Sequence, residues 1–405
     1  KLSEDGIFVA NLIGDLSRQE PSLIMSVIKK FQTVFPNSYF FAVDAPDKIG
    51  SQNIIFVGYN SNKKMDFNDP KITKDENPII QSLGRKVIYL DRFEFSKYPL
   101  LTDNFSPVEY LTAQVLQKSF SQQKFIDGNE MLALIDQQLR YGPRYLSASG
   151  HKNIQKFLIA EMNALAQETK IQTWQHTSSD GQKHELTNIV GRLYPTNEKR
   201  IILATHYDSK KFADKDTQKQ DQPVPGANDS ASGVAVLLEL ARILTNSHYI
   251  PNVGVDIVFF DGEEGEENQG GDYTNWKPLG STYFAEHLSD IYGNNKPISG
   301  IVLDMACDKN LEISKEQSSV QNTPAQIETF WNIAKKIDGN AFRDQVGPEI
   351  RDDHTPLNQV GIPSFLVIDL EYPPFHTTND TLDKCSAKSL ETVANAVLNY
   401  AYVVR

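Results

Sequence analysis

From residue 125 to the end of this 405-residue chain, short apolar runs alternate with longer segments of helical periodicity. The runs that predict strands cover residues 187–194, 200–206, 253–260, 299–304 and 364–370. Apolar residues three and four positions apart predict helices over 128–140, 150–167, 229–246, 280–289, 322–338 and 386–403. Strands separated by helices usually lie parallel in one sheet. We therefore expect a three-layer α/β/α domain with a mostly parallel central sheet.

Side chains of the types that bind metal ions stand at or just after the ends of these predicted strands. In open α/β sheets, ligands bind beyond the carboxyl ends of the strands. Histidines and carboxylates that leave one coordination position open are typical of catalytic zinc. The sequence therefore predicts a metal site drawn from His206, Asp208, Asp229, Glu263, Glu264, Asp304 and His376.

Taken singly, these residues also have structural interpretations. Asp229 stands at the start of a predicted helix, where a capping residue belongs. His206 alone would equally suit a hydrogen-bonded core histidine. Glu266 and Glu267 are expected to be solvated loop residues. The other histidines are expected to be surface or structural residues: His151, His176, His184, His248 and His287.

The stretch VFFDGEEGEE, residues 258–267, passes from a buried strand into five carboxylates. Like charges at the end of a buried strand repel one another and resist desolvation. A bound dication would offset that cost. We expect one of Glu263 and Glu264 to bind the metal and the other to transfer protons.

Several other functions are disfavoured by the sequence. The net charge of −12 argues against nucleic acid and anionic membranes as main partners. No apolar run approaches the roughly 20 residues that span a bilayer. The sequence has no G-x-S-x-G elbow, P-loop or G-x-G-x-x-G. Neither Cys307 nor Cys385 lies in a C-x-x-C pair, and whether the two form a disulfide stays open.

Seven motifs occur in an order that resembles peptidase family M28, over about residues 124–405. They are THYDS, GANDSASGVAVLLELAR, FFDGEE, LGSTYFAEHL, VLDM, DDHTPL and FHTTNDTLDKC. The family includes dizinc aminopeptidases and glutaminyl-peptide cyclotransferases, and its fold is that of zinc hydrolases. Three stretches resemble the cyclase branch, which converts N-terminal glutamine of peptides to pyroglutamate and releases ammonia. They are HYDSK, DDH and EYPPFHTTNDTLDKC.

The resemblance implies a role for each matching residue. One zinc ion would be held by Asp229, Glu264 and His376. Glu263 would be the general acid and base, with the carboxylates of Asp304 and Asp352 beside it. The resemblance places Trp276, Ile350, Phe375 and His354 at the substrate. Animal cyclases have Trp at the position of Phe375, and the segment GEENQGGDYTNWKP before and after Trp276 is longer than expected, so the shape of this pocket stays open.

Two alternatives to a cyclase remain. His206 and Asp304 match the remaining ligands of a second zinc ion, as a dizinc aminopeptidase that removes N-terminal residues would require. A non-catalytic binding module is the other alternative.

The first 114 residues resemble a different family. Strands are predicted at 7–13, 38–43 and 53–59, and a helix at 21–35. Four stretches resemble the C-terminal half of the spermidine synthase family, which has a methyltransferase-type Rossmann fold. They are LSEDGIFVANLIG, VFPNSYFFAV, QNIIFVGYNS and LLTDNFSPVEYL. The cofactor loop of that family would lie upstream of Lys1, so no aminopropyl transfer is expected.

The resulting domain prediction has three parts. Residues 1–116 would be a truncated spermidine synthase-like half that packs with a missing upstream segment, and residues 117–124 would be a linker. Residues 125–405 would be the zinc domain. The chain is accordingly expected to be a fragment or a processed product. The spermidine synthase-like part favours the cytoplasm, whereas cyclases of this group are often periplasmic or secreted, so the compartment stays open.

Overall fold

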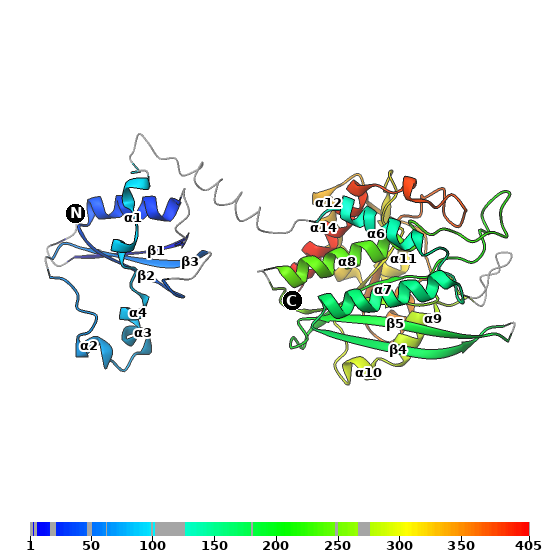
Figure 1. Ribbon diagram of the computed structural model, residues 1–405, viewed down its shortest axis with the longest axis horizontal. Coiled ribbons are helices and arrows are strands. Elements are labelled where there is room, and N and C mark those ends of the chain that lie inside the picture. Colours follow the sequence, from blue (N-terminus) through cyan, green and yellow to red (C-terminus); the bar gives the residue numbers. More distant parts are fainter. Residues whose placement is uncertain are drawn as a thin grey trace. The chain divides into compact units, whose positions relative to one another are not determined.

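The computed structural model describes residues 3, 6–16, 22–46, 51–61, 63–98, 100–101, 126–179, 181–247, 250–265 and 276–404. The chain divides into two compact units, Lys1–Gln123 and Lys124–Arg405, which are treated separately (Figure 1). The predicted linker 117–124, His248, Glu266 and Glu267 lie outside the described residues.

The N-terminal unit contains a three-stranded antiparallel sheet in the order β1-β3-β2. The helix α1 begins after Ser22, whose side chain accepts a hydrogen bond from the Met25 N–H. Its buried residues Ile24, Met25 and Ile28 pack against Phe40 and Phe56 of the sheet. The larger elements are β1 (Ile7–Asp15), α1 (Leu23–Val34), β2 (Asn37–Ala42) and β3 (Ser51–Tyr59).

Short helical turns follow this sheet. They are α2 (Pro70–Thr73), α3 (Pro78–Gln81), α4 (Leu83–Lys86), η1 (Leu90–Arg92) and η2 (Phe95–Lys97). The three predicted strands and the helix are present within a few residues of their expected bounds. All strand pairs described in this unit are antiparallel, so the Rossmann-like arrangement is not confirmed and the spermidine synthase resemblance stays a prediction.

The C-terminal unit is built on a six-stranded sheet in the order β11-β8-β6-β7-β5-β4. The four strands from β11 to β7 are mutually parallel, while β5 and β4 run antiparallel to their neighbours. The strands are β4 (Glu168–Thr177), β5 (Lys183–Leu193), β6 (Arg200–His206), β7 (Gly254–Phe260), β8 (Ser299–Asp304) and β11 (Ser364–Ile368). A parallel pair, β9 (Ile313–Lys315) and β10 (Phe342–Val346), forms a separate two-stranded sheet.

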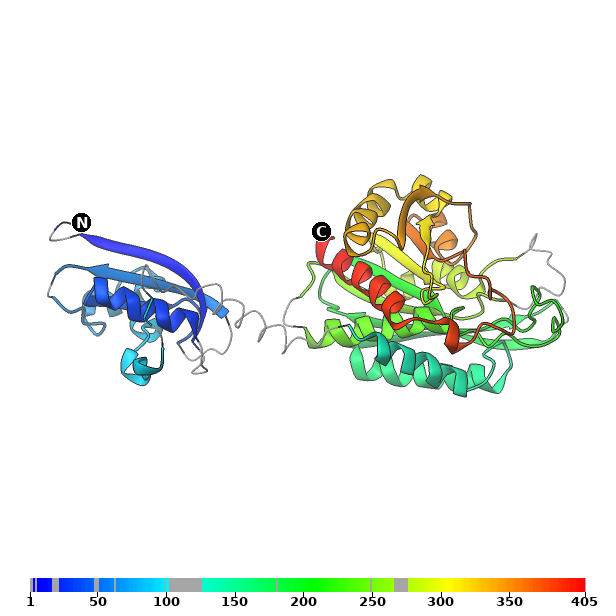
Figure 2. The same ribbon diagram turned by 90° about the horizontal axis from the view of Figure 1, so that it is seen from above.

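Helices cover both faces of this sheet (Figures 1 and 2). One apolar core joins the sheet to α6 (Gly128–Arg140), α7 (Ser149–Leu165), α8 (Ala231–Asn246), α12 (Pro324–Ile337) and α14 (Ala387–Val403). A second core joins the opposite face to α9 (Leu279–Glu286), α10 (Ser289–Tyr292) and α13 (His354–Gln359). The remaining elements are α11 (Gln317–Asn322) and η3 (Leu382–Lys384). The predicted three-layer α/β fold is confirmed.

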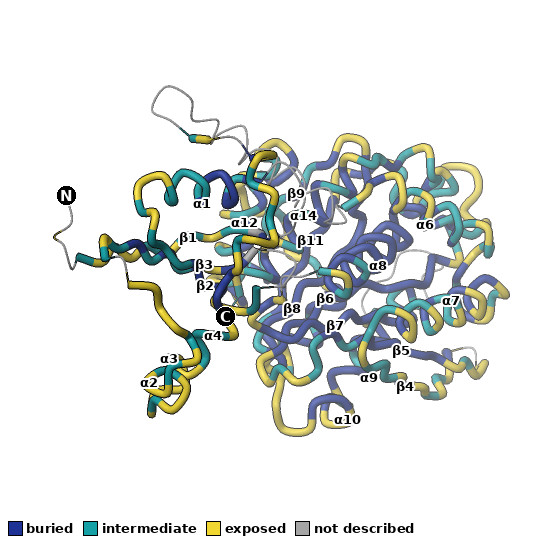
Figure 3. The backbone as a smooth tube through the Cα atoms, turned by 60° about the vertical axis from the view of Figure 1, so that its left-hand side comes forward, coloured by how far each residue is buried: buried dark blue, intermediate teal, exposed yellow. Residues whose placement is uncertain are grey.

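The central strands and α8 form the most deeply buried part of this unit (Figure 3). Each residue of β6, β7, β8 and β11 is buried, as expected for parallel strands that are covered on both faces. Among the described residues, no helix combines the length and apolarity that crossing a membrane requires.

Cys307 and Cys385 form a disulfide, which answers the question left open by the sequence. The bond joins the segment after β8 to the segment before α14, across 78 positions in the chain. It therefore ties the edge of the sheet that carries Asp304 to the C-terminal part of the chain.

Asp369, directly after β11, should make the stability of this unit depend on pH. Burial raises the pKa of its carboxyl to about 7. Hydrogen bonds from the backbone N–H groups of Glu312 and Glu371 lower the pKa but do not cancel this effect. The unfolded carboxyl titrates near pH 4. The cost of burying its charge is therefore absent below about pH 4 and grows as the pH rises to about 7.

Asp369→Asn should thus gain stability relative to the parent protein between pH 4.5 and pH 8, by at least about 1 kcal/mol. Urea unfolding at the two pH values measures this difference. Asp290→Asn, at an exposed position of α10, is the matched control. An equal free-energy gap between parent and Asp369→Asn at both pH values would contradict this account.

Candidate metal centre

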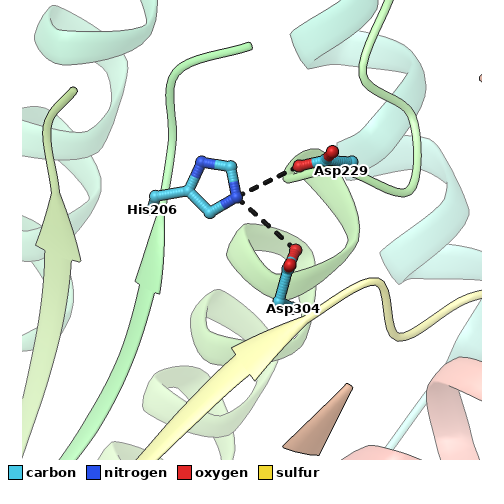
Figure 4. A group of neighbouring side chains, drawn as sticks. All are labelled: His206, Asp229 and Asp304. Carbon is cyan, nitrogen blue, oxygen red and sulfur yellow. Dashed lines mark ion pairs between the residues drawn. The ribbon is translucent and has the colours of Figure 1, made fainter. Parts of the chain in front are cut away.

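Three ligand-type side chains converge beyond the carboxyl ends of β6 and β8 (Figure 4). His206 ends β6, Asp304 ends β8, and Asp229 lies in the turn before α8. The Nε2 atom of His206 is 3.2 Å from Asp229 Oδ1 and 3.5 Å from Asp304 Oδ1. All three side chains are buried, so they form one compact group with the composition of a metal site.

A second group uses the other oxygen of Asp229. His376 Nε2 lies 3.6 Å from Asp229 Oδ2 and 3.6 Å from Glu264 Oε1. The ligand atoms of each group lie within 4.8 Å of one another. The predicted zinc ligands Asp229, Glu264 and His376 are therefore brought together, and the two additional candidates lie on the other side of the same carboxylate.

The residues fit a divalent cation. His206 Nε2, Glu264 Oε1 and Asp304 Oδ1 are buried and make no hydrogen bond within the described residues. A buried polar atom without a partner costs free energy, which a metal ion bound to it would offset. Imidazole nitrogens and carboxylate oxygens are also the ligands of catalytic zinc sites.

The electrostatics of the site favour a cation as well. Burial alone would lower the pKa of His206, but the carboxylates of Asp208, Asp229 and Asp304 outweigh it and raise that pKa well above its ordinary value. The carboxylates around His206 therefore favour positive charge at this position, as a bound cation would also supply.

Asp208 connects the end of β6 to the turn that follows β7. Its carboxylate accepts hydrogen bonds from the backbone N–H groups of Glu263 and Glu264, both at 3.1 Å. It also lies 3.3 Å from His206 Nδ1, which leaves Nε2 facing the carboxylates of the site. The sequence placed Asp208 at a strand end but did not indicate this orienting role.

The turn before Asp229 is held by Arg144, which the sequence did not single out. Its buried guanidinium donates hydrogen bonds to the carbonyl oxygens of Pro225, at 3.0 Å, and Gly226, at 2.6 Å. Burial lowers the pKa of Arg144 to about 10, so the side chain remains a cation at neutral pH. It therefore adds positive charge behind a site that is rich in carboxylates.

A cavity of about 280 Å³ opens onto the second group. Glu263 is half-buried in its wall, and Trp276 Nε1 donates a hydrogen bond to the Glu263 carbonyl oxygen at 3.1 Å. The predicted residues Trp276, Ile350, Phe375 and Asp352 all line it. The full lining is Lys210, Asp229, Glu263, Glu264, Trp276, Asp304, Glu349, Ile350, Arg351, Asp352, Ile368, Leu370, Phe375 and His376.

Glu263 sits among other acids. Burial raises the pKa of its carboxyl well above the ordinary value, and although His206 opposes this shift, the charge of Asp352 adds to it. Burial likewise raises the pKa of Asp352, with the charge of Asp304 contributing. Of the two carboxylates that the sequence placed beside Glu263, Asp352 therefore interacts with it, while Asp304 interacts with Asp352.

Two expectations from the sequence are wrong. Asp229 does not cap α8, because the helix begins at Ala231 and the capping position is Ser230. His354 does not line the cavity: it is fully buried at the start of α13, with Nε2 3.0 Å from Ser318 Oγ and 3.3 Å from Glu316 Oε2. Its Nε2 atom thus faces these two residues and not the cavity, which indicates a structural role.

The sequence also missed Lys210. Its ammonium lies 3.0 Å from Glu264 Oε2, and both side chains are buried. Because Oε2 is paired in this way, Oε1 of the same carboxylate is left to face His376. A lysine in a polar loop gives no periodic signal, so its pairing with Glu264 could not be inferred.

A model of peptidase family M28 matches residues 188–401, more than half of the chain. The chain belongs to peptidase family M28. Glutaminyl-peptide cyclotransferase of Bos taurus is 26% identical to this M28 chain over 252 residues, which cover 54% of this chain and 67% of that protein.

Solved structures of both functional types are similar to this M28 chain. Glutaminyl cyclase of Tannerella forsythia matches with 30% identity and a TM-score of 0.64, over 70% of this chain and 100% of that one. A Zn-dependent exopeptidase from Parabacteroides distasonis matches with 30% identity and a TM-score of 0.65, over the same shares. The family assigned from the motifs is confirmed, and these relatives support zinc as the metal.

Gly280 in α9 should be essential for positioning the turn that carries Glu263 and Glu264. A Cβ atom at this position would lie 2.5 Å from the backbone N and O of Asp261 and 2.6 Å from Asn188 Oδ1. Asp261 is itself fixed, since its carboxylate accepts from the Thr187 N–H at 2.7 Å and pairs with His151 Nε2 at 2.6 Å. His151 is thus structural, as the sequence predicted.

Gly280→Ala should therefore displace the turn, weaken zinc binding and cost about 1–3 kcal/mol of stability. Chelator competition and urea unfolding measure the two effects. Glu286→Ala, at an exposed position of the same helix, should leave both unchanged. If Gly280→Ala behaves like this control, the tight approach of α9 to Asp261 does not hold the turn.

Proposed function

We propose that this chain catalyses the cyclisation of N-terminal glutamine of peptides to pyroglutamate, with release of ammonia. Two lines of evidence support the proposal. Relatives and similar structures are named glutaminyl-peptide cyclotransferase or glutaminyl cyclase. The observation that carries it is the position of Glu263, in the wall of a cavity that also contains Asp229, Glu264 and His376.

In this proposal zinc is held by Asp229, Glu264 and His376. When bound, zinc supplies Lewis-acid polarisation of a carbonyl oxygen. Two contacts of the protein hold Glu264 in position. Asp208 accepts a hydrogen bond from its backbone N–H in the turn after β7, and the Lys210 ammonium pairs with its Oε2 atom.

Glu263 is the proton-transfer group. The α-amino nitrogen of the substrate attacks the γ-amide carbon, a C–N bond forms, and the original C–N bond of the amide breaks. Glu263 accepts a proton from the attacking amine and returns it to the departing nitrogen, which leaves as ammonia. The raised pKa of Glu263 suits this role, because it makes the carboxylate a better proton acceptor than an exposed glutamate.

The walls of the cavity hold the side-chain amide of the substrate close to its own α-amine. Cyclisation requires the glutamine side chain to fold back on its own amine, and holding that conformation lowers the barrier. Trp276, Ile350 and Phe375 provide apolar surface for the side-chain methylene groups. The cavity of about 280 Å³ suits one amino-acid residue with its neighbouring peptide bond.

A short peptide that begins with Gln should lose one ammonia when it is incubated with the zinc-loaded chain, and mass spectrometry of the product measures this loss. Glu263→Gln should reduce the rate by at least about 100-fold, because general acid–base catalysis is typically worth that much. Zinc binding should persist in this variant, since Glu263 is not a proposed ligand. Glu286→Gln, at an exposed position, should retain full activity. Full activity in Glu263→Gln would rule out the proton-transfer role.

A dizinc aminopeptidase is the second candidate function. The specific observation that favours it is the intact group of His206, Asp229 and Asp304, and a similar structure is named a Zn-dependent exopeptidase. Glu263 would then activate water, and the product would lack its whole first residue. The number of bound ions separates the two candidates.

A single zinc ion per chain is expected for the cyclase. His376→Ala should then abolish high-affinity zinc binding, whereas His206→Ala should retain one ion, as measured by metal analysis after dialysis. Two ions in the parent protein, and one in each variant, would favour the aminopeptidase instead. A chain that binds no zinc would support a non-catalytic binding module.

The N-terminal unit adds no chemistry to this proposal. Its assignment to the C-terminal half of the spermidine synthase family, over residues 1–116, rests on sequence resemblance. Its packing with an upstream segment, the linker at 117–124 and the zinc domain at 125–405 are proposals on the same basis.

A further inference from the structure

Residues 214–216 lie within the long loop between β6 and α8 and contact the segment 375–378, which carries His376. Four hydrogen bonds and one cation–π contact connect the two segments, although they are about 160 positions apart in the chain. Neither segment belongs to a helix or a strand. The contacts therefore fix two irregular segments against each other at the wall of the cavity.

Asp214 contacts the proposed zinc ligand directly. Its Oδ1 atom lies 3.1 Å from Nδ1 of His376. An ionised carboxylate only accepts hydrogen bonds, so this contact is a hydrogen bond in the tautomer that carries the ring proton on Nδ1. In that tautomer, Nε2 would offer its lone pair to an ion on the side where Asp229 and Glu264 lie, each 3.6 Å away. Asp214 thereby fixes both the tautomer and the rotation of the ring.

Lys215 holds the neighbouring residue. Its backbone N–H donates to the carbonyl oxygen of His376 at 3.3 Å. Its ammonium lies 3.9 Å from the centre of the Phe375 ring, within the range of a cation–π interaction. The Phe375 ring is also 3.8 Å from the ring of His376. Phe375 is thus fixed by contacts to Lys215 and His376 while it lines the cavity.

Asp216 anchors the far end of the segment. Its Oδ2 atom accepts hydrogen bonds from the backbone N–H of Thr378 at 3.1 Å and from Thr378 Oγ1 at 2.7 Å. Its Oδ1 atom accepts from the N–H groups of Gln218 and Lys219, which closes the turn that follows. The loop is therefore internally braced as well as attached to the 375–378 segment.

We propose that residues 214–216 form a strap that positions the metal ligand and one wall of the cavity: Asp214 is the positioning residue for His376, and Lys215 is the positioning residue for Phe375. The part that concerns Phe375 rests on the proposed function. The part that concerns Asp214 depends only on metal binding, so it is tested separately from catalysis.

Zinc affinity tests Asp214. Competition with a chromophoric chelator is measured for the parent chain, Asp214→Ala, Asp214→Asn and the control Asp221→Asn, which changes an exposed carboxylate of the same loop. Asp214→Ala should weaken zinc binding by about 10–100-fold, the usual effect of removing the partner of a metal-bound histidine. Asp214→Asn should recover most of the affinity, because its amide oxygen can still accept the Nδ1 proton.

Two results would overturn the role of Asp214. One is zinc affinity of Asp214→Ala equal to that of Asp221→Asn. The other is an equal loss in Asp214→Asn and Asp214→Ala, which would exclude ring orientation as the cause. If Asp214→Ala does not fold, the zinc affinity of Asp214→Asn is compared with that of Asp221→Asn. Orientation of the ring by residue 214 predicts only a small loss of zinc affinity in Asp214→Asn, so a large loss would overturn this role. If the chain has no cyclase activity at all, these zinc measurements still stand.

Steady-state kinetics on a Gln-initiated peptide test Lys215. Lys215→Met removes the charge above Phe375 but keeps the length of the side chain and the backbone hydrogen bond. It should raise KM by about two- to fivefold, the range expected for an exposed cation–π contact, while kcat and zinc affinity stay constant. Lys219→Met, at an exposed position of the same loop, is the control. Equal KM values in the two variants would overturn the role of Lys215.

Discussion

The carboxylate of Asp229 is the interaction on which the rest of the site depends. Each of its oxygens faces a different histidine, so one side chain determines the geometry of both ligand groups. Its backbone is fixed in turn by Asp380, which accepts hydrogen bonds from the N–H groups of Asn228 and Asp229. The Asn228 side chain also accepts the N–H of Cys307 at 2.8 Å, which connects this turn to the strand end of β8. The fold thus supports one shared ligand from several elements.

Much of the C-terminal fold could be predicted because its central strands are buried on both faces. Residues 200–206, 253–260 and 299–304 read as continuous apolar runs for that reason, and helix periodicity located the layers around them. The edge strand β4 was not predicted, because only one of its ten residues is buried and polar side chains interrupt its apolar positions. In the N-terminal unit, the strands were located but the sheet they form could not be deduced from their positions alone.

Whether a site residue could be predicted also depended on the kind of structure that carries it. Residues placed by strand ends, namely His206, Glu264 and Asp304, follow from one rule of α/β sheets and were found. Residues placed by irregular loops were not: Lys210 and Asp214 reach the site through tertiary contacts that leave no periodic pattern in the sequence. His354 shows the opposite failure, since a motif next to the site suggested a contact that burial prevents.

His376 follows the other histidine of the site, His206, only after 170 positions of the chain. During synthesis, a nascent chain that has reached residue 350 already contains Asp229, Glu264 and Asp304 but lacks the histidine that completes the second ligand group. Domains generally form as units as the chain emerges from the ribosome. The second group of buried ligand-type side chains can therefore be completed only after β11 and the segment that follows it have been made, so an ion held by Asp229, Glu264 and His376 would be acquired after all six strands of the central sheet have been synthesised.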